Sequence, residues 1–195
     1  MSSILSDFSD QWRKQVRKFL RQIDTTEVED PTSKGLVNLI KRERSLIDQM
    51  IKGADRLGKV LRDKPPQFFL CHADIHGWNV IIQPDGSLYV VDWDTVTLAP
   101  KERDLMSIAS GLFGKDRTPE EEEMLFYQGY GNQDQVDPLG LAYYRYERII
   151  RDIAEYCELI LHSSSSPEGR EKGLQQLATQ FESGNVVEIA MRSEK

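Results

Sequence analysis

Apolar residues recur at helical spacing through the first third of this chain. Intervals of three and four residues are typical of an amphipathic helix that directs one face at a core. Over residues 5–23 these positions are Leu5, Phe8, Trp12, Val16, Phe19, Leu20 and Ile23. The spacing resumes from Leu36 to Leu61 with charged residues on the opposite face, and Pro65-Pro66 ends it. Residues 1–67 are therefore predicted to be a helical segment.

Helical patterns return in residues 100–195, which we interpret as a helical subdomain. A short helix is predicted over residues 102–113 and a long one over residues 138–162. Between them Thr118 precedes a proline, and Glu121 completes a capping box, so a helix is predicted to begin there. The last two helices are predicted around Leu174, Leu177 and Phe181 and after Asn185.

The segment between these parts, residues 68–99, has two runs of apolar and β-branched residues separated by Pro84-Asp85-Gly86-Ser87. Asp-Gly between two such runs is a strong hairpin signal. With Asp85 and Gly86 as the turn, the predicted register places Asn79 opposite Asp92. A bulged turn containing Pro84 would shift that register by one residue. The predicted fold of the chain is thus α+β and mostly helical, a single domain around one small hairpin.

Composition limits the partners that the chain can have. With 25 basic and 32 acidic side chains its formal charge is −7, which argues against a nucleic-acid surface and suits cationic small molecules. Cys71 and Cys157 have apolar neighbours and are interpreted as reduced, buried thiols. The first residues lack the basic segment and apolar core of a secretory signal, and no apolar run approaches the ~20 residues of a membrane span. A soluble, cytoplasmic protein is expected.

Three residues of segment 68–99 form a candidate catalytic site. In the predicted register, the amide oxygen of Asn79 and the carboxylate of Asp92 could close on one Mg²⁺ ion. Asp74 lies one loop upstream of them, where its carboxylate is free to accept a proton. This combination is typical of metal-dependent phosphoryl transfer.

A zinc site is the competing interpretation of the same loop. His72, Asp74 and His76 alternate as if on one strand face, which could place three zinc ligands together in a metal-dependent hydrolase. Such a site usually needs further ligands, and His162, the remaining histidine, lies far along the chain at a helix end.

Other residues of the region have less specific interpretations. Asp94 could bind the metal or the substrate, or it could cap the residues that follow it. Trp78 and Trp93 are interpreted as local packing. The acidic residues of the long helix are interpreted as a solvated face; they include Glu147, Asp152, Glu155 and Glu158.

The run HADIHGWN from His72 to Asn79, followed by Asp92-Trp93-Asp94, resembles the aminoglycoside phosphotransferase and choline kinase-like family. These enzymes share the protein-kinase fold, whose catalytic loop reads H-x-D-x-x-x-x-N and is followed by a metal-binding D-x-G. The second motif departs from that pattern, because Asp94 stands where protein kinases have glycine. The resemblance is strong over residues 68–110 and only topological over the remaining helices.

The resemblance implies a reaction and its central residues. The γ-phosphate of ATP would pass to a hydroxyl of a small cationic molecule, an aminoglycoside or an aminocyclitol such as spectinomycin. Asp74 would be the base that deprotonates this hydroxyl. Asn79 and Asp92 would hold Mg²⁺ against the phosphates of ATP.

The resemblance also implies supporting residues. His72 would brace the catalytic loop by hydrogen bonds, and Asp104 would anchor the loop from the following helix. His76 and Asp94 are candidates for contacting the substrate or for supporting the residues that do.

Protein kinases hold the nucleotide with a glycine-rich loop and a lysine on a strand. Residues 1–67 contain Gly35, Gly53 and Gly58 but no G-x-G pattern and no strand-forming run. The chain is therefore expected to be the C-terminal lobe of a protein-kinase-like fold, with the N-terminal nucleotide lobe absent. A non-catalytic ligand-binding module is the alternative to a working enzyme. The lobe face left exposed is expected to favour self-association or another partner.

Overall fold

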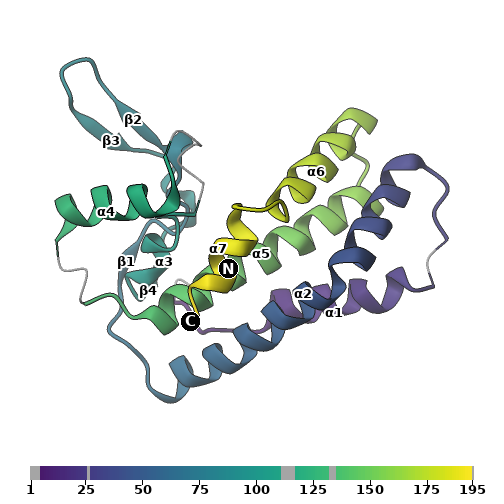
Figure 1. Cartoon of the computed structure of the whole chain (residues 1–195), viewed down its shortest axis with the longest axis horizontal. Helices are drawn as coiled ribbons and strands as arrows, with labels where there is room; N and C mark the ends of the chain where they lie inside the picture. The colour runs from purple at the N-terminus through teal and green to yellow at the C-terminus, as the bar shows by residue number, and fades with distance from the viewer. Residues whose placement is uncertain (1–4, 26, 111–116, 132–134, 195) are drawn as a thin grey trace. The chain divides into compact units, whose positions relative to one another are not determined.

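A computed structural model describes residues 5–25, 27–110, 117–131 and 135–194 of the chain. It confirms an α+β, mostly helical fold with short antiparallel strand pairs (Figure 1). The chain divides into two compact units, one formed by residues 1–9, 57–145 and 192–195 and the other by residues 10–56 and 146–191. Among the helices of the described ranges, none combines the length and the apolar character needed to cross a bilayer.

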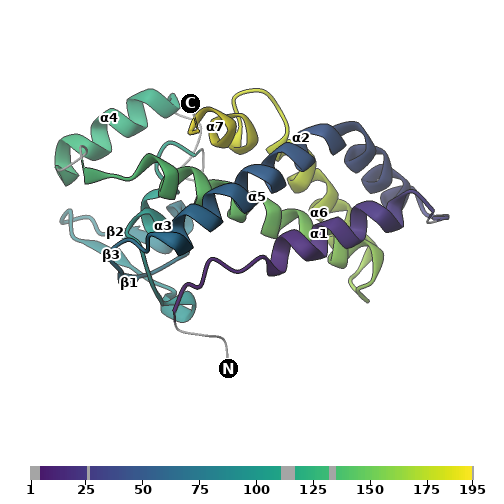
Figure 2. The same ribbon diagram turned by 90° about the horizontal axis from the view of Figure 1, so that it is seen from below.

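The unit that contains residues 10–56 and 146–191 is helical in its described parts. Its helices are α1 (Gln11–Ile23), most of α2 (Pro31–Asp63), most of α5 (Pro138–Leu161), α6 (Pro167–Gln180) and nearly all of α7 (Val186–Arg192). Figure 2 shows these helices from a second direction. Their buried side chains recur at the predicted spacing, which confirms the long amphipathic helices; the buried set includes Val16, Phe19, Ile40, Ile47, Ile150, Ile153 and Leu177.

Ion pairs lie inside this helical unit. The Arg13 side chain is 1% exposed, and its Nε lies 2.9 Å from a carboxylate oxygen of Asp55. A second guanidinium nitrogen of Arg13 contacts Glu147. Burial raises the pKa of Glu147 to about 7, while the positive charge of Arg13 opposes that rise. The Asp152 side chain is 16% exposed, and Gln180 Nε2 donates to it at 2.9 Å. The prediction of a solvated face is therefore wrong for Glu147 and Asp152.

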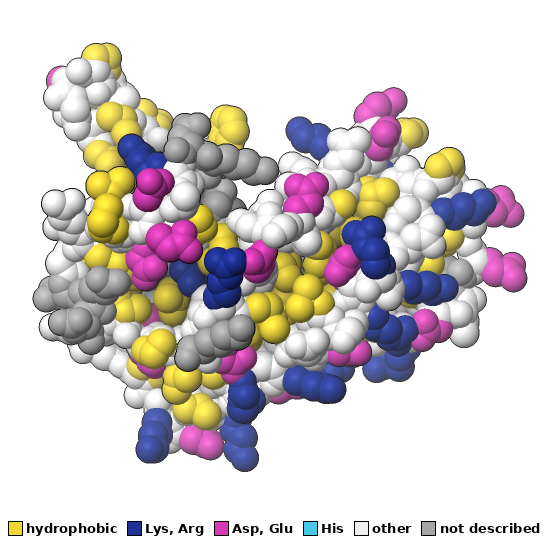
Figure 3. Space-filling model, in the orientation of Figure 1, with side chains coloured by type: hydrophobic (Ala, Val, Ile, Leu, Met, Phe, Trp, Pro, Cys, Tyr) yellow, Lys and Arg dark blue, Asp and Glu magenta, His cyan; other side chains and the backbone are white. Residues whose placement is uncertain are grey.

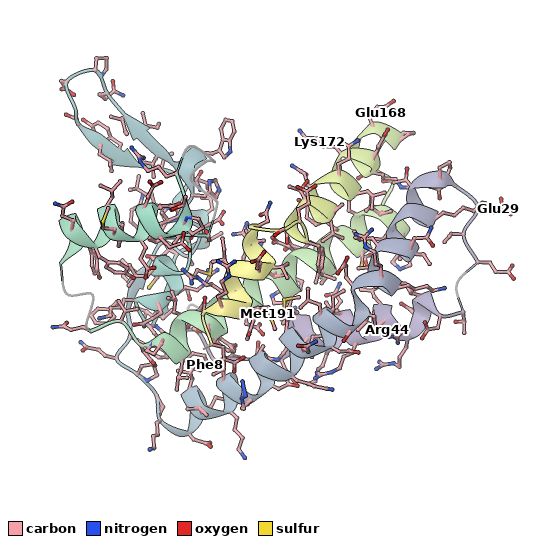
Figure 4. The ribbon with its side chains drawn as sticks, viewed as in Figure 1. Phe8, Glu29, Arg44, Glu168, Lys172 and Met191 are labelled. Carbon is pink, nitrogen blue, oxygen red and sulfur yellow. The ribbon has the colours of Figure 1, made fainter. Side chains whose placement is uncertain are left out.

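The first helix begins later than predicted, at Gln11 rather than at Leu5. Leu5 instead forms a parallel bridge to Leu98, and the Ser6 amide donates to the Leu98 carbonyl at 2.8 Å. Phe8, labelled in Figure 4, has a φ of 53° and packs edge-on against Tyr143, with ring centroids 5.5 Å apart. Leu5 and Phe8 fit the helical spacing by coincidence, because their contacts are with a strand and with aromatic side chains.

The other unit contains two antiparallel strand pairs. β1 (Phe69–Cys71) pairs with β4 (Thr97–Ala99), and β2 (Val80–Ile82) pairs with β3 (Leu88–Val90). Only the second pair was predicted. The first was missed because each strand has three residues and the two are far apart in sequence, so no local turn signal joins them.

The hairpin register differs from the prediction by one residue. Its pairs are Val80 with Val90, Ile81 with Tyr89, and Ile82 with Leu88. The predicted opposition of Asn79 and Asp92 is therefore wrong. The residue that pairs with Asn79 is Val91, whose amide donates to the Asn79 carbonyl at 3.0 Å.

The shift comes from a three-residue turn. The Gly86 amide donates to the Gln83 carbonyl at 2.9 Å, and the Gln83 amide donates to the Ser87 carbonyl at 2.9 Å. Pro84 suits the second position of a type I turn because its φ is already fixed near the required value. Gly86, with a φ of 85°, then supplies the left-handed conformation that closes the loop.

The hairpin exposes apolar side chains on both of its faces. Ile81 and Tyr89 are 43% and 56% exposed, and their neighbours Ile82 and Leu88 are 70% and 60% exposed. Figure 3 shows hydrophobic side chains on the surface over this part of its unit. An isolated two-stranded hairpin is marginally stable in water, so the hairpin depends on the residues that attach it to its unit. The expected self-association or partner contact through an exposed lobe face stays a prediction.

Two further helices of this unit are α3 (Glu102–Leu105) and α4 (Pro119–Tyr130). The predicted capping box of α4 is confirmed: Thr118 Oγ1 accepts from the Glu121 amide at 3.2 Å, and Glu121 Oε2 accepts from the Thr118 amide at 3.0 Å. The helix predicted over residues 102–113 ends instead at Leu105, and its last three residues lie outside the described ranges.

Side chains from other elements explain the early end of α3. Arg145 donates to the Met106 and Ile108 carbonyls at 3.2 and 2.6 Å. Glu122 accepts from the amide of Ala109 at 3.0 Å, and Ala109 has a φ of 55°. These bonds hold the backbone groups that a longer helix would pair internally.

Candidate active site

Asp104 holds the start of the loop that follows β1. Its two carboxylate oxygens accept from the His72 amide at 2.9 Å and from the Ala73 amide at 2.7 Å. Ala73 has a φ of 67°, a left-handed conformation that costs on the order of 1–3 kcal/mol for a residue with a side chain. The two charge-assisted hydrogen bonds offset that cost and fix the direction in which the chain leaves β1.

The buried His72 ring links this loop to the end of the hairpin. Its Nε2 lies 2.9 Å from the Val91 carbonyl oxygen, and the Asp74 amide donates to its Nδ1 at 3.3 Å. Because a carbonyl can only accept, Nε2 carries the hydrogen and Nδ1 is the acceptor. The imidazole therefore joins the backbone of Asp74 to the residue that precedes Asp92.

Thr95 and Trp93 make a second link between the same two segments. Thr95 Oγ1 donates to the His72 carbonyl at 2.8 Å. Trp93 donates from Nε1 to the Val90 carbonyl at 2.8 Å, and its ring meets the His72 ring edge-on with centroids 4.8 Å apart. Trp93 thus packs locally, as predicted, although it is 52% exposed. The contribution of Thr95 was not predicted, because a threonine after Asp92-Trp93-Asp94 carries no signal of what it binds.

Asn79 is buried at the end of the same loop, in the 3₁₀ turn Gly77–Asn79. Its Nδ2 donates to the Asp74 carbonyl at 2.9 Å and lies 3.3 Å from His76 Nε2. At least one amide hydrogen, the one donated to the Asp74 carbonyl, is therefore directed at a protein acceptor. The Oδ1 atom keeps its lone pairs for another ligand, which is the arrangement that a metal-binding amide needs.

Asp92 has a φ of 65° and a ψ of 63°, a left-handed conformation at the exit of the hairpin. Backbone outliers of this kind concentrate at functional sites, where the surrounding contacts enforce them. The carboxylates of Asp92 and Asp94 are exposed, and within the described part of the chain neither has a hydrogen bond or an ion pair. Both carboxylates are therefore available to a cation.

Asp74 and His76 lie close together on the loop. Asp74 Oδ2 is 3.6 Å from His76 Nε2, which is longer than a hydrogen bond, and both side chains are about one-quarter exposed at 27% and 21%. The structure does not support the zinc interpretation. Both ring nitrogens of His72 are bound by the backbone, and the described residues contain no cluster of three His, Cys, Asp or Glu side chains that could hold a metal.

The oxygen donors of this region fit magnesium. The free Oδ1 of Asn79 and the uncommitted carboxylate of Asp92 are hard oxygen ligands, which Mg²⁺ prefers over nitrogen or sulfur. These two residues are not paired across the hairpin as predicted. They belong instead to two segments joined by the bond between Val91 and Asn79.

Trp78 differs most from its predicted environment. Its side chain is 90% exposed, so the interpretation as a packing residue is wrong. The neighbouring Asn79 is buried and hydrogen-bonded, which means that the backbone of the turn is held although the indole is not covered.

Replacing Asp104 by asparagine is expected to destabilise the loop. An amide group can accept only one of the two backbone hydrogen bonds and turns its own N–H₂ group against the other donor. Hydrogen bonds to charged groups contribute about 1.5–3 kcal/mol each, so we expect a loss of that size. Thermal denaturation would measure it, at about 2–4 °C per kcal/mol for a chain of this length. The matched control is Asp94→Asn, which should leave the melting temperature unchanged; equal effects of the two substitutions would contradict the anchoring role.

Comparison with known proteins finds a matching family and several solved structures. Residues 5–144 match the phosphotransferase enzyme family (APH). A crystal structure of spectinomycin phosphotransferase, APH(9)-Ia, in complex with ADP and spectinomycin is 35% identical, with a TM-score of 0.86 over 97% of this chain. The AMP-bound complex of the same enzyme is also 35% identical, with a TM-score of 0.81 over 96% of this chain. Choline kinase LicA from Streptococcus pneumoniae is 20% identical, with a TM-score of 0.44 over 92% of this chain and 68% of its own.

The chain spans 57% of the length of the spectinomycin phosphotransferase structures. Sequence comparison with the curated proteins gave no match.

Proposed function

Since the chain belongs to the phosphotransferase enzyme family, we propose that it takes part in phosphoryl transfer from ATP to a hydroxyl group of a small molecule. One observation carries the proposal: a chain of hydrogen bonds joins the loop of Asp74 to the turn of Asp92. The Asp74 carbonyl accepts from the Asn79 side chain at 2.9 Å, and the Asn79 carbonyl accepts from the Val91 amide at 3.0 Å. These bonds hold the loop of Asp74 next to the turn of Asp92. The proposed proton acceptor and the two proposed oxygen ligands therefore keep their relative positions.

In this reaction the acceptor oxygen attacks the γ-phosphorus, and the bond from that phosphorus to the β–γ bridging oxygen breaks. The hydroxyl proton passes to a carboxylate oxygen of Asp74. Little covalent chemistry is required of the protein, so orientation of the hydroxyl by Asp74 supplies much of the rate. His76, at 3.6 Å from Asp74, is proposed to support the position of that carboxylate.

Asn79 and Asp92 would hold Mg²⁺, which, when bound, neutralises negative charge on the phosphates. Asp94, two residues further along and exposed, is proposed to contact the ion or an ammonium group of the acceptor. His72, Thr95 and Asp104 bind the backbone of the site and are proposed to position the residues that contact the reactants.

An amino sugar or an aminocyclitol is the proposed acceptor, with spectinomycin as the first candidate. The related enzyme at 35% identity was crystallised with ADP and spectinomycin, which supports both a nucleotide and a cyclic, cationic acceptor. The exposed carboxylates of Asp92 and Asp94 suit a cation in the same region.

A coupled assay of ADP release tests the function. The panel contains spectinomycin, aminoglycosides and choline, at millimolar ATP with Mg²⁺, and mass spectrometry identifies the phosphorylated product. Two proteins are assayed: the 195-residue chain, and a chimera that joins it to the segment of spectinomycin phosphotransferase that it does not span. Spectinomycin phosphate formed by the chimera is the expected result.

The assay also separates the competing functions. Acceptor binding by both proteins without turnover in either would favour a non-catalytic binding module. If neither protein binds or phosphorylates any compound of the panel, the proposed function is wrong.

A further inference from the structure

Trp78 is the most exposed large apolar side chain in the described part of the chain, at 90%. Tryptophan is buried in most folded proteins because it has a large apolar surface. No described ring stacks on Trp78, in contrast to Trp93, which meets His72, and to Trp12, which has Arg151 over its ring at 5.8 Å. An indole so exposed has no role in the packing of its own unit.

The backbone that carries Trp78 is nevertheless held firmly. The Asn79 amide donates to the His76 carbonyl at 2.9 Å, and the Asn79 side chain donates to the Asp74 carbonyl at 2.9 Å. These two bonds close the short loop that contains Trp78. Trp78 therefore lies on the same loop as the proposed proton acceptor, Asp74. The hydrogen bonds restrict the backbone of this loop to few conformations.

The charged side chains of the segment that contains this loop have one sign. Residues 68–99 contain four aspartates and neither lysine nor arginine. Three of these aspartates, Asp74, Asp92 and Asp94, belong to the candidate site. The face of an indole ring is itself electron-rich and attracts cations within about 6 Å of its centre. An exposed indole in an acidic segment is thus suited to a ligand that has both apolar ring carbons and a positive charge.

We propose that Trp78 is a specificity residue for the acceptor, an inference that rests on the proposed function. Its indole covers the carbon face of a cationic sugar or cyclitol ring and contacts an ammonium group, while Asp74 receives the hydroxyl that reacts. Trp78 discriminates against neutral polyols, which have similar hydroxyl groups but no charge for the ring face to attract. A role in contact with another protein is the competing use of an exposed indole.

Calorimetric titration of the 195-residue chain tests this assignment. The probes are spectinomycin, which is cationic, and myo-inositol, a neutral polyol. Trp78→Ala is expected to weaken spectinomycin binding about 3- to 30-fold, which is the range of one cation–π contact, and Trp78→Phe to weaken it less. Binding of myo-inositol should be weak and unchanged in every variant. Trp12→Phe, which alters an indole of the other unit, is the matched control and should retain the affinity of the unsubstituted chain.

Tryptophan fluorescence gives an independent measurement. Spectinomycin should change the emission of the unsubstituted chain and of Trp12→Phe, and this change should be lost in Trp78→Phe. The melting temperature of Trp78→Ala should equal that of the unsubstituted chain, because the indole is 90% exposed. Equal spectinomycin affinity in the unsubstituted chain and Trp78→Ala would overturn the inference and leave the proposed function intact. Absence of spectinomycin binding to the unsubstituted chain and to the chimera would overturn both.

A change in self-association, measured by sedimentation, with no change in spectinomycin affinity would assign Trp78 to a protein contact instead. That result would also overturn the inference.

Discussion

Asp74→Asn is expected to lower the rate of phosphoryl transfer to spectinomycin by about 10²–10⁴-fold, because it removes the proton acceptor and keeps the shape of the side chain. The measurement is the initial rate of ADP release by the chimera described above. The KM for spectinomycin should change much less than kcat, since an amide can still hydrogen-bond the acceptor hydroxyl. Asparagine has nearly the same size as aspartate, and the hydrogen bonds of the Asp74 backbone do not depend on the charge of its side chain, so the fold should be retained.

Two comparisons make this prediction specific. His76→Gln should have a smaller effect than Asp74→Asn, because His76 lies 3.6 Å from the Asp74 carboxylate and is proposed only to support it. The melting temperature of Asp74→Asn should match that of the parent protein. Unchanged turnover in Asp74→Asn would show that Asp74 is structural, and a large fall in melting temperature would show that the substitution tests folding rather than proton transfer.

Local signals in the sequence were sufficient for several elements. The capping box of Thr118 and Glu121 forms as predicted because both partners lie within one helical turn and need no tertiary context. The long helices α2 and α5 follow from apolar spacing, since that spacing reports directly which face is buried.

The hairpin shows that such local signals do not determine the register of paired strands. Asp85-Gly86 predicts a two-residue turn and Pro84 favours a three-residue one, and the two differ by one step in register. A shift of one residue changes which side chains lie opposite one another, so the predicted register could not by itself place Asn79 and Asp92 together. The observed link between Asn79 and the turn of Asp92 runs through the backbone of Val91.

The backbone of the candidate site could not be predicted from residue types. Ala73 and Asp92 have φ values of 67° and 65°, in a region that alanine in particular rarely enters. Both are adjacent to hydrogen bonds made by residues distant in the sequence: Asp104 binds the Ala73 amide, and His72 binds the Val91 carbonyl. Conformations imposed by tertiary contacts cannot be predicted from the local sequence.

Apolar spacing alone does not give the exposure of side chains that have both polar and apolar character. Arg13 is 1% exposed and lies next to Asp55 and Glu147, whereas Trp78 is 90% exposed. A pattern of apolar spacing treats arginine as surface and tryptophan as core. An arginine can nevertheless be buried when it forms an ion pair. A tryptophan can lie at the surface when it binds a ligand there.

The polypeptide of residues 1–195 by itself is expected to bind ATP weakly and to turn over little. Kinases of this fold class hold the phosphates with a glycine-rich loop and a strand lysine. Residues 11–23 and 31–63 are the helices α1 and α2, so they provide neither feature. The chain spans 57% of the length of spectinomycin phosphotransferase. We expect a dissociation constant for MgATP at or above about 1 mM, the upper end of ordinary enzyme KM values.

Calorimetry with the chain and with the chimera measures this difference. The chimera should bind MgATP at least ten-fold more tightly, and Asp92→Asn should weaken MgATP binding to the chimera much more than binding of ATP without Mg²⁺. That contrast is expected because the carboxylate of Asp92 is proposed to act through the ion and not through the nucleotide itself. A well-held reactant complex can be worth ~7–11 kcal/mol of the barrier, so a chain that does not hold the nucleotide should be slow even with Asp74 in place. Micromolar ATP affinity of the chain alone, with turnover at the ~1–100 s⁻¹ of ordinary kinases, would contradict this prediction and mean that another segment of residues 1–195 binds the phosphates.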